Sequence, residues 1–221
     1  MGFDKLAAPL AGKPVLWHSL RVFGTMPEVD RLIVVTRPER MQEIEALALD
    51  AAPDTPLSVV EGGEERYLSV WAGLQALHAD TAEFVAIHDG ARPLITQGSI
   101  RACVDLARRD GAACCASPIP DTVKRADSAG FVVESVERNG LWAMQTPQVF
   151  SSGLILQAYD AIIARNHMVT DEVSAVQKLG RRVALYPNEE WNFKITFPRD
   201  LEMAGQVLAA RENPRPGGSG A

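Results

Sequence analysis

The stretch Phe84-Val-Ala-Ile-His-Asp-Gly-Ala-Arg-Pro93 joins a short apolar run to a polar turn. Apolar runs of this length, bounded by glycine and proline, are typical of buried β-strands. In sheets built from alternating strands and helices, ligands bind beyond the carboxyl ends of the strands. Asp89 and Arg92 are therefore predicted to lie at a binding site.

Similar apolar runs recur along the chain and alternate with helical patterns. Strands are predicted at residues 31–36, 57–60, 84–89, 111–117 and 182–186, and helices at residues 15–23, 66–77, 100–107 and 154–163. Thr170 is predicted to cap a further helix with Asp171 and Glu172 in its first turn, and Pro198 is predicted to open the last helix. This alternation predicts an α/β fold in which helices cover both faces of a mainly parallel sheet.

Residues 120–142 interrupt this alternation with two polar extended stretches on either side of Ala126-Asp-Ser-Ala-Gly130. Such a segment predicts a protruding β-hairpin arm, of a kind that can reach a partner subunit. The chain as a whole is predicted to form a single domain over residues 1–211, followed by a disordered tail at residues 212–221.

The composition is that of an ordinary globular protein: 221 residues, 47% hydrophobic and 23% charged. A formal net charge of −6 argues against nucleic-acid binding, although a few cations can still converge on a small anion. No stretch is apolar enough for a membrane span, and the first residues lack the order of a signal peptide. Cys103, Cys114 and Cys115 are interpreted as buried thiols in a reducing compartment, so a cytoplasmic location is expected.

Several residues are candidates for binding phosphate groups. Asp89 can hold a hard cation whose other ligands are phosphate oxygens, and Arg92 can meet a phosphate bidentately. The alternative for both is an ion pair that closes a tight turn. Gly62 and Gly63 precede a helix that contains Ser69, and glycines at such a place let backbone N–H groups approach an anion. Any strand-to-helix turn can use glycines in the same way.

Two further cations have unusual surroundings. Arg138 lies near Trp142 and Thr146 in the sequence, and a cation, a hydroxyl and a turn fixed by proline can shape a phosphate pocket. Lys194 lies in the apolar segment Asn192-Phe-Lys-Ile-Thr196, where a bound anion would account for its charge. A side chain that snorkels to solvent is the alternative for Lys194.

Seven short motifs follow one another along the chain: Gly-Lys-Pro-Val-Leu (12–16), Gly-Gly-Glu-Glu-Arg (62–66) with Ser69, His-Asp-Gly-Ala-Arg-Pro (88–93), Pro-Asp-Thr-Val-Lys-Arg (120–125), Leu-Trp-Ala-Met-Gln-Thr-Pro-Gln (141–148), Thr-Asp-Glu (170–172) and Asn-Phe-Lys-Ile-Thr (192–196). Together they resemble the 2-C-methyl-D-erythritol 4-phosphate cytidylyltransferase family. The resemblance implies a Rossmann-like nucleotidyltransferase that forms a homodimer through its hairpin arms. It also implies the reaction, in which the 4-phosphate of the substrate attacks the α-phosphorus of CTP and releases pyrophosphate.

The resemblance further implies roles for particular residues. Asp89 would hold Mg²⁺ against the triphosphate, and Lys5, Lys194 and Arg138 would be catalytic. The nucleotide-binding set would be Gly62, Gly63, Glu64, Ser69 and Asp89. The set that positions methylerythritol phosphate, part of it from a second subunit, would be Arg92, Thr122, Arg138, Thr146, Thr170 and Lys194.

The sequence departs from the family pattern in two places. Members of the family begin with a strand and a glycine-rich loop that wraps the triphosphate, and Met1-Gly2 correspond to the last two residues of that pattern. A central strand, most of the loop and its arginine are therefore expected to be missing, with weakened CTP binding as the result. Glu64 stands where the family often has Asp.

Two other functions stay open. A sister cytidylyltransferase would act on ribitol phosphate or another pentitol phosphate, and Arg138, Thr146 and the arm do not separate it from the methylerythritol phosphate enzyme. An inactive nucleotidyltransferase-like domain would serve as a dimer partner or binding module. The missing loop favours this last reading, whereas Asp89, Arg138 and Lys194 argue against it.

Overall fold

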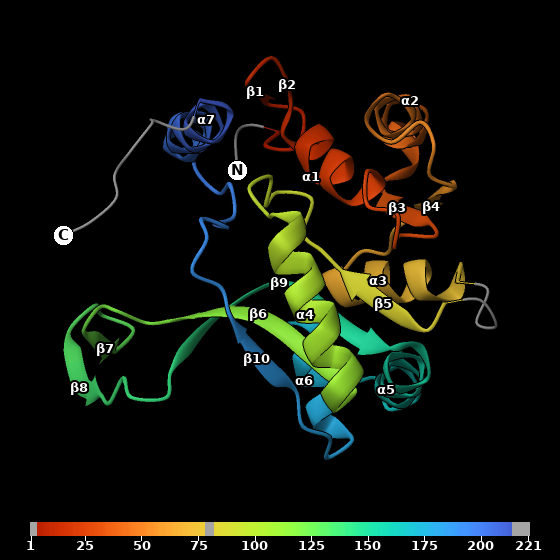
Figure 1. Ribbon diagram of the computed structural model, residues 1–221. Coiled ribbons are helices and arrows are strands. Elements are labelled where there is room, and N and C mark those ends of the chain that lie inside the picture. Colours follow the sequence, from red (N-terminus) through yellow and green to blue (C-terminus); the bar gives the residue numbers. More distant parts are fainter. Residues whose placement is uncertain (1–3, 78–81, 214–221) are drawn as a thin grey trace.

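A computed structural model describes residues 4–77 and 82–213 (Figure 1). Its helices are α1 (Val15–Gly24), α2 (Met41–Ala51), α3 (Arg66–Gln75), α4 (Gln97–Asp110), α5 (Ser152–Ala164), α6 (Glu172–Lys178) and α7 (Pro198–Glu212), with a short 3-10 turn at Pro38–Arg40. Its strands are β1 (Pro9–Leu10), β2 (Lys13–Pro14), β3 (Leu32–Thr36), β4 (Leu57–Glu61), β5 (Phe84–Ile87), β6 (Ala112–Pro118), β7 (Val123–Ala126), β8 (Val132–Val136), β9 (Trp142–Ser151) and β10 (Ala184–Pro187). The predicted α/β class is confirmed. Most of the predicted disordered tail, residues 214–221, lies outside the described residues.

Four strands form the larger sheet, in the order β10-β6-β9-β5. β10 and β6 are parallel, as are β3 and β4 in a separate pair. β9, in contrast, runs antiparallel to both of its neighbours. The prediction of a mainly parallel sheet therefore holds for two of these four pairings and is wrong at β9.

The sequence does not predict β9, because Pro147 lies inside it and proline donates no hydrogen bond to a ladder. The register between β6 and β9 shifts between Cys114, which pairs with Gln148, and Ala116, which pairs with Met144. Pro147 falls in this irregular stretch, where the missing N–H is tolerated.

Both faces of β6 are covered, and successive side chains of this strand point to opposite faces. Ala113 and Cys115 pack with Cys103 of α4, whereas Ala112 and Cys114 pack on the side of α5 and α6. This arrangement accounts for the continuous apolar run, since a strand buried on both faces needs apolar side chains on both. The three cysteines are fully buried free thiols, as predicted.

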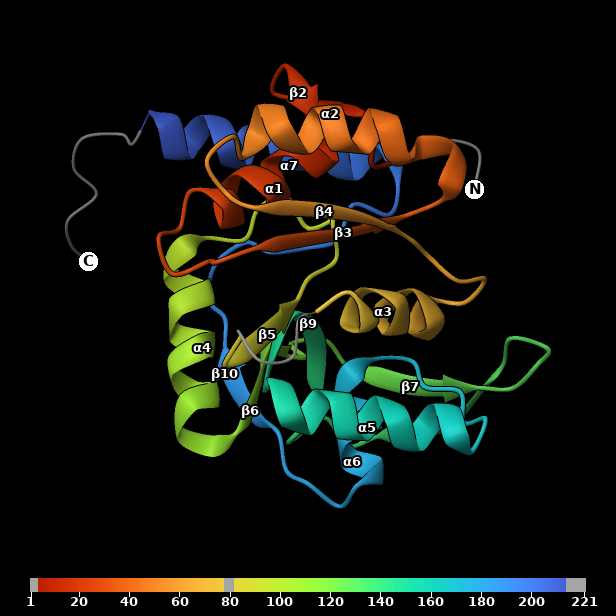
Figure 2. The same ribbon diagram turned by 90° about the vertical axis from the view of Figure 1, so that its right-hand side faces the viewer.

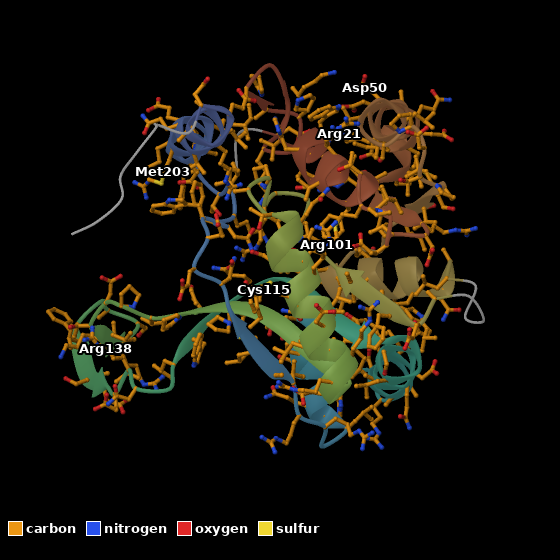
Figure 3. All side chains as sticks on the ribbon, in the orientation of Figure 1. Arg21, Asp50, Arg101, Cys115, Arg138 and Met203 are labelled. Carbon is orange, nitrogen blue, oxygen red and sulfur yellow. The ribbon has the colours of Figure 1, made fainter. Side chains whose placement is uncertain are left out.

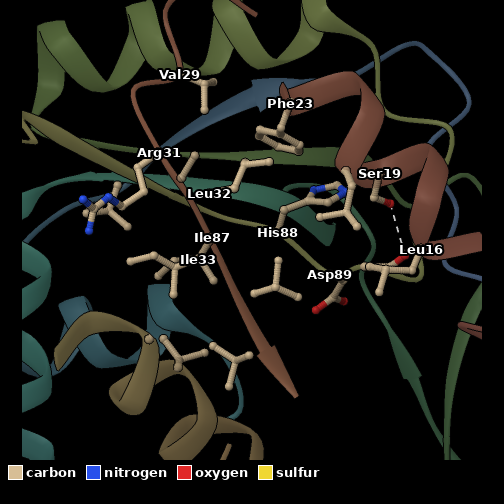
Figure 4. Close-up of a pocket in the computed structure, with 18 of the residues that line it drawn as sticks. Leu16, Ser19, Phe23, Val29, Arg31, Leu32, Ile33, Ile87, His88 and Asp89 are labelled. Atoms are coloured by element: carbon tan, nitrogen blue, oxygen red, sulfur yellow. Dashed lines mark hydrogen bonds between the residues drawn. The ribbon is translucent and has the colours of Figure 1, made fainter. Parts of the chain in front are cut away.

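β3 and β5 each have an edge that pairs with no strand among residues 4–77 and 82–213. They line a cavity of about 850 Å³, with Arg31 near one end and Asp89 near the other (Figure 4). Figure 2 shows α1 and α2 on one side of β3 and β4 and α3 on the other, and Leu16 of α1 and Leu74 of α3 both line the cavity. Among the described residues, β3 and β4 therefore form one sheet and β10-β6-β9-β5 another.

The predicted hairpin arm, residues 120–142, is present and projects from the body of the molecule (Figure 1). At its turn, the Asp127 carboxylate accepts hydrogen bonds from the N–H groups of Ala129 and Phe131, at 3.0 and 2.9 Å. Gly130 has a φ of +87°, which L side chains rarely adopt. The arm carries Phe131, Val132 and Val133 with their side chains in solvent.

Helix α6 begins one residue later than predicted. Its N-cap is Asp171, whose carboxylate accepts a hydrogen bond from the Ser174 N–H at 3.0 Å, and not Thr170. An Asp is at least as good a cap as Thr, so the choice between adjacent residues depends on packing. Pro198 opens α7, as predicted. No helix in the described part of the chain is long and apolar enough to span a membrane.

Candidate active site

Asp89 follows β5 and lies within a cluster of positive charges. Lys194 Nζ is 2.8 Å from Asp89 Oδ2. Arg66 Nη2 is 3.4 Å from Oδ1, and Arg92 Nε is 3.8 Å from Oδ2. Burial by itself would raise the pKa of Asp89, but the hydrogen bond from Lys194 and the three positive charges outweigh burial and lower it. Asp89 is therefore ionised at neutral pH, and the cluster keeps an excess of positive charge.

Lys194 reaches Asp89 from an extended segment between β10 and α7. The segment is anchored on both sides of Lys194: Asn192 Nδ2 donates to Thr146 O at 2.8 Å, and the Ile195 N–H donates to Ala91 O at 2.8 Å. This anchoring directs the ammonium group to the cavity. A lysine ammonium has three donors, so the contact with Asp89 leaves it able to bind an anion as well.

Lys5 lines the same cavity as Asp89 and Lys194. Its pKa is lowered, mainly by burial and then by the charge of Lys194, and Asp89 offsets only part of this effect. The two ammonium groups repel each other, and an anion between them would stabilise both. The structure thus brings together two of the three predicted catalytic residues.

Arg92 is held at the edge of the cluster by backbone carbonyl groups. Its Nη1 donates to Asn192 O at 2.7 Å and its Nη2 to Met144 O at 3.4 Å. The Arg92 N–H also donates to Asp89 O at 2.9 Å, which closes the turn that the sequence suggests. Arg92 Nε is buried, and it has no hydrogen-bond partner within residues 4–77 and 82–213. A buried donor without a partner is costly, and a phosphate oxygen would satisfy it.

Thr146, buried in β9, connects Asp89 to His88. Its hydroxyl oxygen accepts a hydrogen bond from the Asp89 N–H at 3.0 Å and lies 3.0 Å from His88 Nδ1. His88 Nε2 lies 3.2 Å from Arg92 O, which can only accept. We therefore assign the proton to Nε2, with the Thr146 hydroxyl donating to Nδ1. Burial lowers the pKa of His88 to about 4, consistent with this neutral ring.

Gly62 and Gly63 lie between β4 and α3, where the chain passes close to the first turns of the helix. A Cβ atom at Gly62 would lie 2.8 Å from Ser69 Oγ, and one at Gly63 would lie 2.4 Å from Leu68 Cβ. Ser69 donates its hydroxyl to Gly63 O at 3.2 Å, which ties the loop to the helix. The close approach to Leu68 by itself requires glycine at position 63, whatever the loop binds. Glu64 is exposed at the tip of the same loop.

Two predicted site residues lie on the arm, apart from Asp89. Thr122 and Arg138 line a separate hollow of about 350 Å³, and Arg138 donates to Pro120 O. Figure 3 shows Arg138 far out on the arm, whereas Cys115 lies within the sheet. Within one chain, the structure therefore does not bring Arg138 to the other predicted catalytic residues.

Thr170 is exposed immediately before α6, and its hydroxyl oxygen is 3.5 Å from Ser174 Oγ. That contact is long for a hydrogen bond between hydroxyl groups, so the Thr170 side chain is only loosely held. Nothing in its contacts ties it to Asp89.

Arg66 and Glu172 belong to the motifs 62–66 and 170–172, but no pattern in the sequence assigns a role to them or to Tyr159. In the structure the three residues form a network beside Asp89. Arg66 Nη1 is 2.5 Å from Glu172 Oε1, and the Tyr159 hydroxyl donates to the same oxygen at 3.2 Å. Glu172 is fully buried. A further signal for Glu172 is its place among apolar positions of α6, because a buried carboxylate needs a partner.

A magnesium ion fits the residues at this site. The described residues contain no group of three or more His, Cys, Asp or Glu side chains that could hold a metal by themselves. Magnesium is commonly held by one or two carboxylates together with substrate phosphates. The lone carboxylate of Asp89 amid cations therefore suits an ion that binds together with a polyphosphate.

Comparison with known proteins gives a consistent result. The family "IspD: 2-C-methyl-D-erythritol 4-phosphate cytidylyltransferase" matches residues 1–210. An enzyme of that name from Chromobacterium violaceum is 42% identical over 206 residues, covering 92% of this chain and 88% of the relative. Another, from Caldanaerobacter subterraneus subsp. tengcongensis, is 38% identical over 206 residues, covering 93% of this chain and 90% of the relative.

Solved structures agree with these sequence matches. The 4-diphosphocytidyl-2C-methyl-D-erythritol synthase of Anaerococcus prevotii superposes with a TM-score of 0.83 at 30% identity, covering 92% of this chain and 93% of the other. The 2-C-methyl-D-erythritol 4-phosphate cytidylyltransferase of Thermus thermophilus gives 0.79 at 28% identity, covering 93% and 94%. The family model matches nearly the whole chain, and the solved structures share its fold. The chain therefore belongs to the 2-C-methyl-D-erythritol 4-phosphate cytidylyltransferase family.

Proposed function

We propose that this chain transfers the cytidylyl group of CTP to 2-C-methyl-D-erythritol 4-phosphate in isoprenoid precursor synthesis. The observation that carries the proposal is the cation cluster at the carboxyl end of β5, where Lys194, Arg92 and Arg66 surround Asp89 and Lys5 lines the same cavity. Transfer between phosphate groups depends on positioning and charge neutralisation more than on a covalent nucleophile.

In the reaction, an oxygen of the substrate's phosphate forms a bond to the α-phosphorus of CTP. The bond from that phosphorus to the bridging oxygen breaks, and pyrophosphate leaves with the electron pair. Lys5 and Lys194 neutralise the charge that develops on the α-phosphate, and Arg92 Nε donates to a phosphate oxygen. Asp89 would hold Mg²⁺, which would supply charge neutralisation and orientation to the triphosphate.

The remaining predicted residues receive roles on the same basis. Backbone N–H groups around Gly62 and Gly63 face the nucleotide, with Glu64 and Ser69 beside them. Thr146 acts indirectly, by holding the Asp89 backbone. Thr122 and Arg138 of a second subunit, together with Thr170, bind the polyol phosphate.

The arm supports a homodimer, because it exposes three apolar side chains: Phe131, Val132 and Val133 are 72%, 65% and 59% exposed. Replacing Phe131 and Val133 together by Asp is expected to give a monomer, since two charges cannot be buried unpaired in an interface. Light scattering coupled to size-exclusion chromatography measures the mass. Leu49→Asp, at an exposed apolar position of α2, is the control and should leave the dimer intact. A monomeric parent protein would contradict the proposal.

We also propose a cytoplasmic location. The three cysteines are buried free thiols, which suits a reducing compartment. Detection of the protein in the soluble cytoplasmic fraction of its host would test this assignment.

Pyrophosphate release tests the function directly. With CTP, Mg²⁺ and methylerythritol phosphate we expect turnover, and chelation of the metal should abolish it. Turnover with ribitol phosphate alone would identify the sister enzyme instead. Silence with every polyol phosphate, at CTP concentrations that saturate binding, would favour an inactive binding module.

A further inference from the structure

Arg66 lies between two carboxylates with different surroundings. It is the first residue of α3, and its guanidinium contacts Glu172 through both outer nitrogens, Nη1 to Oε1 at 2.5 Å and Nη2 to Oε2 at 3.0 Å. The same Nη2 is 3.4 Å from Asp89 Oδ1. Glu172 is fully buried, whereas Asp89 lines the cavity. Arg66 thus links a buried structural group to the candidate active site.

The contact with Glu172 fixes the position of the guanidinium group. A bidentate pair between arginine and a carboxylate has a defined plane and orientation, which lysine cannot reproduce. Tyr159 donates its hydroxyl to Glu172 Oε1 at 3.2 Å, so the carboxylate is itself held from α5. The clamp formed by Glu172 and Tyr159 therefore presents Arg66 Nη2 to Asp89 at a fixed place.

The Asp89 carboxylate is contacted at both of its oxygens: Lys194 binds Oδ2 at 2.8 Å, and Arg66 faces Oδ1. We propose that Arg66 is a positioning residue for cytidylyl transfer. Held by the clamp of Glu172 and Tyr159, Arg66 fixes the orientation of the Asp89 carboxylate. This inference rests on the proposed function, because Asp89 is assigned there to the metal-bound triphosphate. It gives the buried Glu172 and Tyr159 an indirect part in the reaction.

A purely structural role would be the neutralisation of Glu172, and the two roles can be separated. Arg66→Lys keeps a charge but loses the fork, so Glu172 is left poorly paired and both thermal stability and kcat should fall. In Arg66→Lys combined with Glu172→Gln, no buried carboxylate needs a partner, and stability should recover. The link to Asp89 stays broken, so kcat should remain about 10- to 100-fold below the parent, with a smaller change in KM.

Two further measurements examine whether the effect passes through Asp89. In an Asp89→Asn background, Arg66→Lys should lower the residual rate by less than about twofold, because the carboxylate it positions is gone. A crystal structure of the Arg66→Lys/Glu172→Gln variant should show the Asp89 carboxylate in more than one orientation. The control is Arg101→Lys on α4, which alters an exposed ion pair between Arg101 and Glu28 and should change none of these values.

The outcomes separate this inference from the proposed function. Absence of turnover in the parent protein would contradict the function, while the orientation of Asp89 in the crystal would still decide the role of Arg66. Recovery of kcat together with stability in the Arg66→Lys/Glu172→Gln variant would overturn the inference. So would a full effect of Arg66→Lys in the Asp89→Asn background, or a single unchanged orientation of Asp89.

Discussion

Replacing Lys194 with Met is expected to lower kcat about 10²- to 10³-fold, the loss typical of removing one preorganised charge from a site of transition-state stabilisation. The Lys194 ammonium group is 2.8 Å from Asp89, nearer than the Arg66 and Arg92 guanidinium groups. The backbone segment that carries Lys194 is anchored on both sides. Met keeps the length and the apolar stem of the side chain, so the change removes the charge with little loss of packing. Stability should change much less than activity, because Arg66 and Arg92 remain near Asp89.

Steady-state pyrophosphate release, together with a thermal melt, measures both quantities. Lys178→Met, at an exposed lysine in the last turn of α6, is the matched control and should retain the parent rate. Lys194→Arg should recover only part of the activity, since a planar guanidinium does not reproduce a compact ammonium. A Lys194→Met enzyme within threefold of the parent would contradict the role proposed for this residue.

The sequence predicts those parts of the molecule that depend on local pattern. The apolar runs at β3, β5 and β6 carry their own signal. In β6 the reason is plain, because a strand covered on both faces needs apolar side chains throughout. The arm is also predicted correctly, since Asp127 and Gly130 form its turn through local contacts. Asp89 and Lys194 stand out for a similar reason: each is a charge next to an apolar run.

Features that depend on distant contacts are not predictable in this way. β9 carries a proline, and only the irregular pairing with β6 accommodates it. Arg66 and Glu172 are 106 residues apart in the chain, so nothing local indicates that they pair. His88 likewise gives no sign that its ring is enclosed on one side by Thr146, which is 58 residues away in the chain, although the Arg92 carbonyl on the other side is only four residues away.

That enclosure of His88 is expected to make stability depend on pH. An unfolded histidine has a pKa near 6.5, whereas burial lowers the pKa of His88 to about 4. Between these values the unfolded chain binds a proton that the folded chain excludes, so the free energy of unfolding falls as the pH drops below about 6.5. The loss should reach about 2 kcal/mol at pH 5 and about 3 kcal/mol near pH 4. Above pH 6.5 this contribution is fully present.

Urea unfolding between pH 7.5 and 5 measures the effect. The quantity to compare is the slope of the free energy of unfolding against pH, because His88→Gln will also lower stability at every pH. The variant should lose most of the slope in this window, since glutamine does not titrate, whereas His167→Gln, at an exposed position, should keep it. Asp89 contributes little here: its pKa is lowered from 3.8, so its stabilising effect is lost only at more acidic pH. A His88 ring that titrates near 6.5 by NMR, or a slope that survives in His88→Gln, would show that the ring is not held neutral by burial, and the hydrogen bond from Thr146 to Nδ1 would then have to be reassigned.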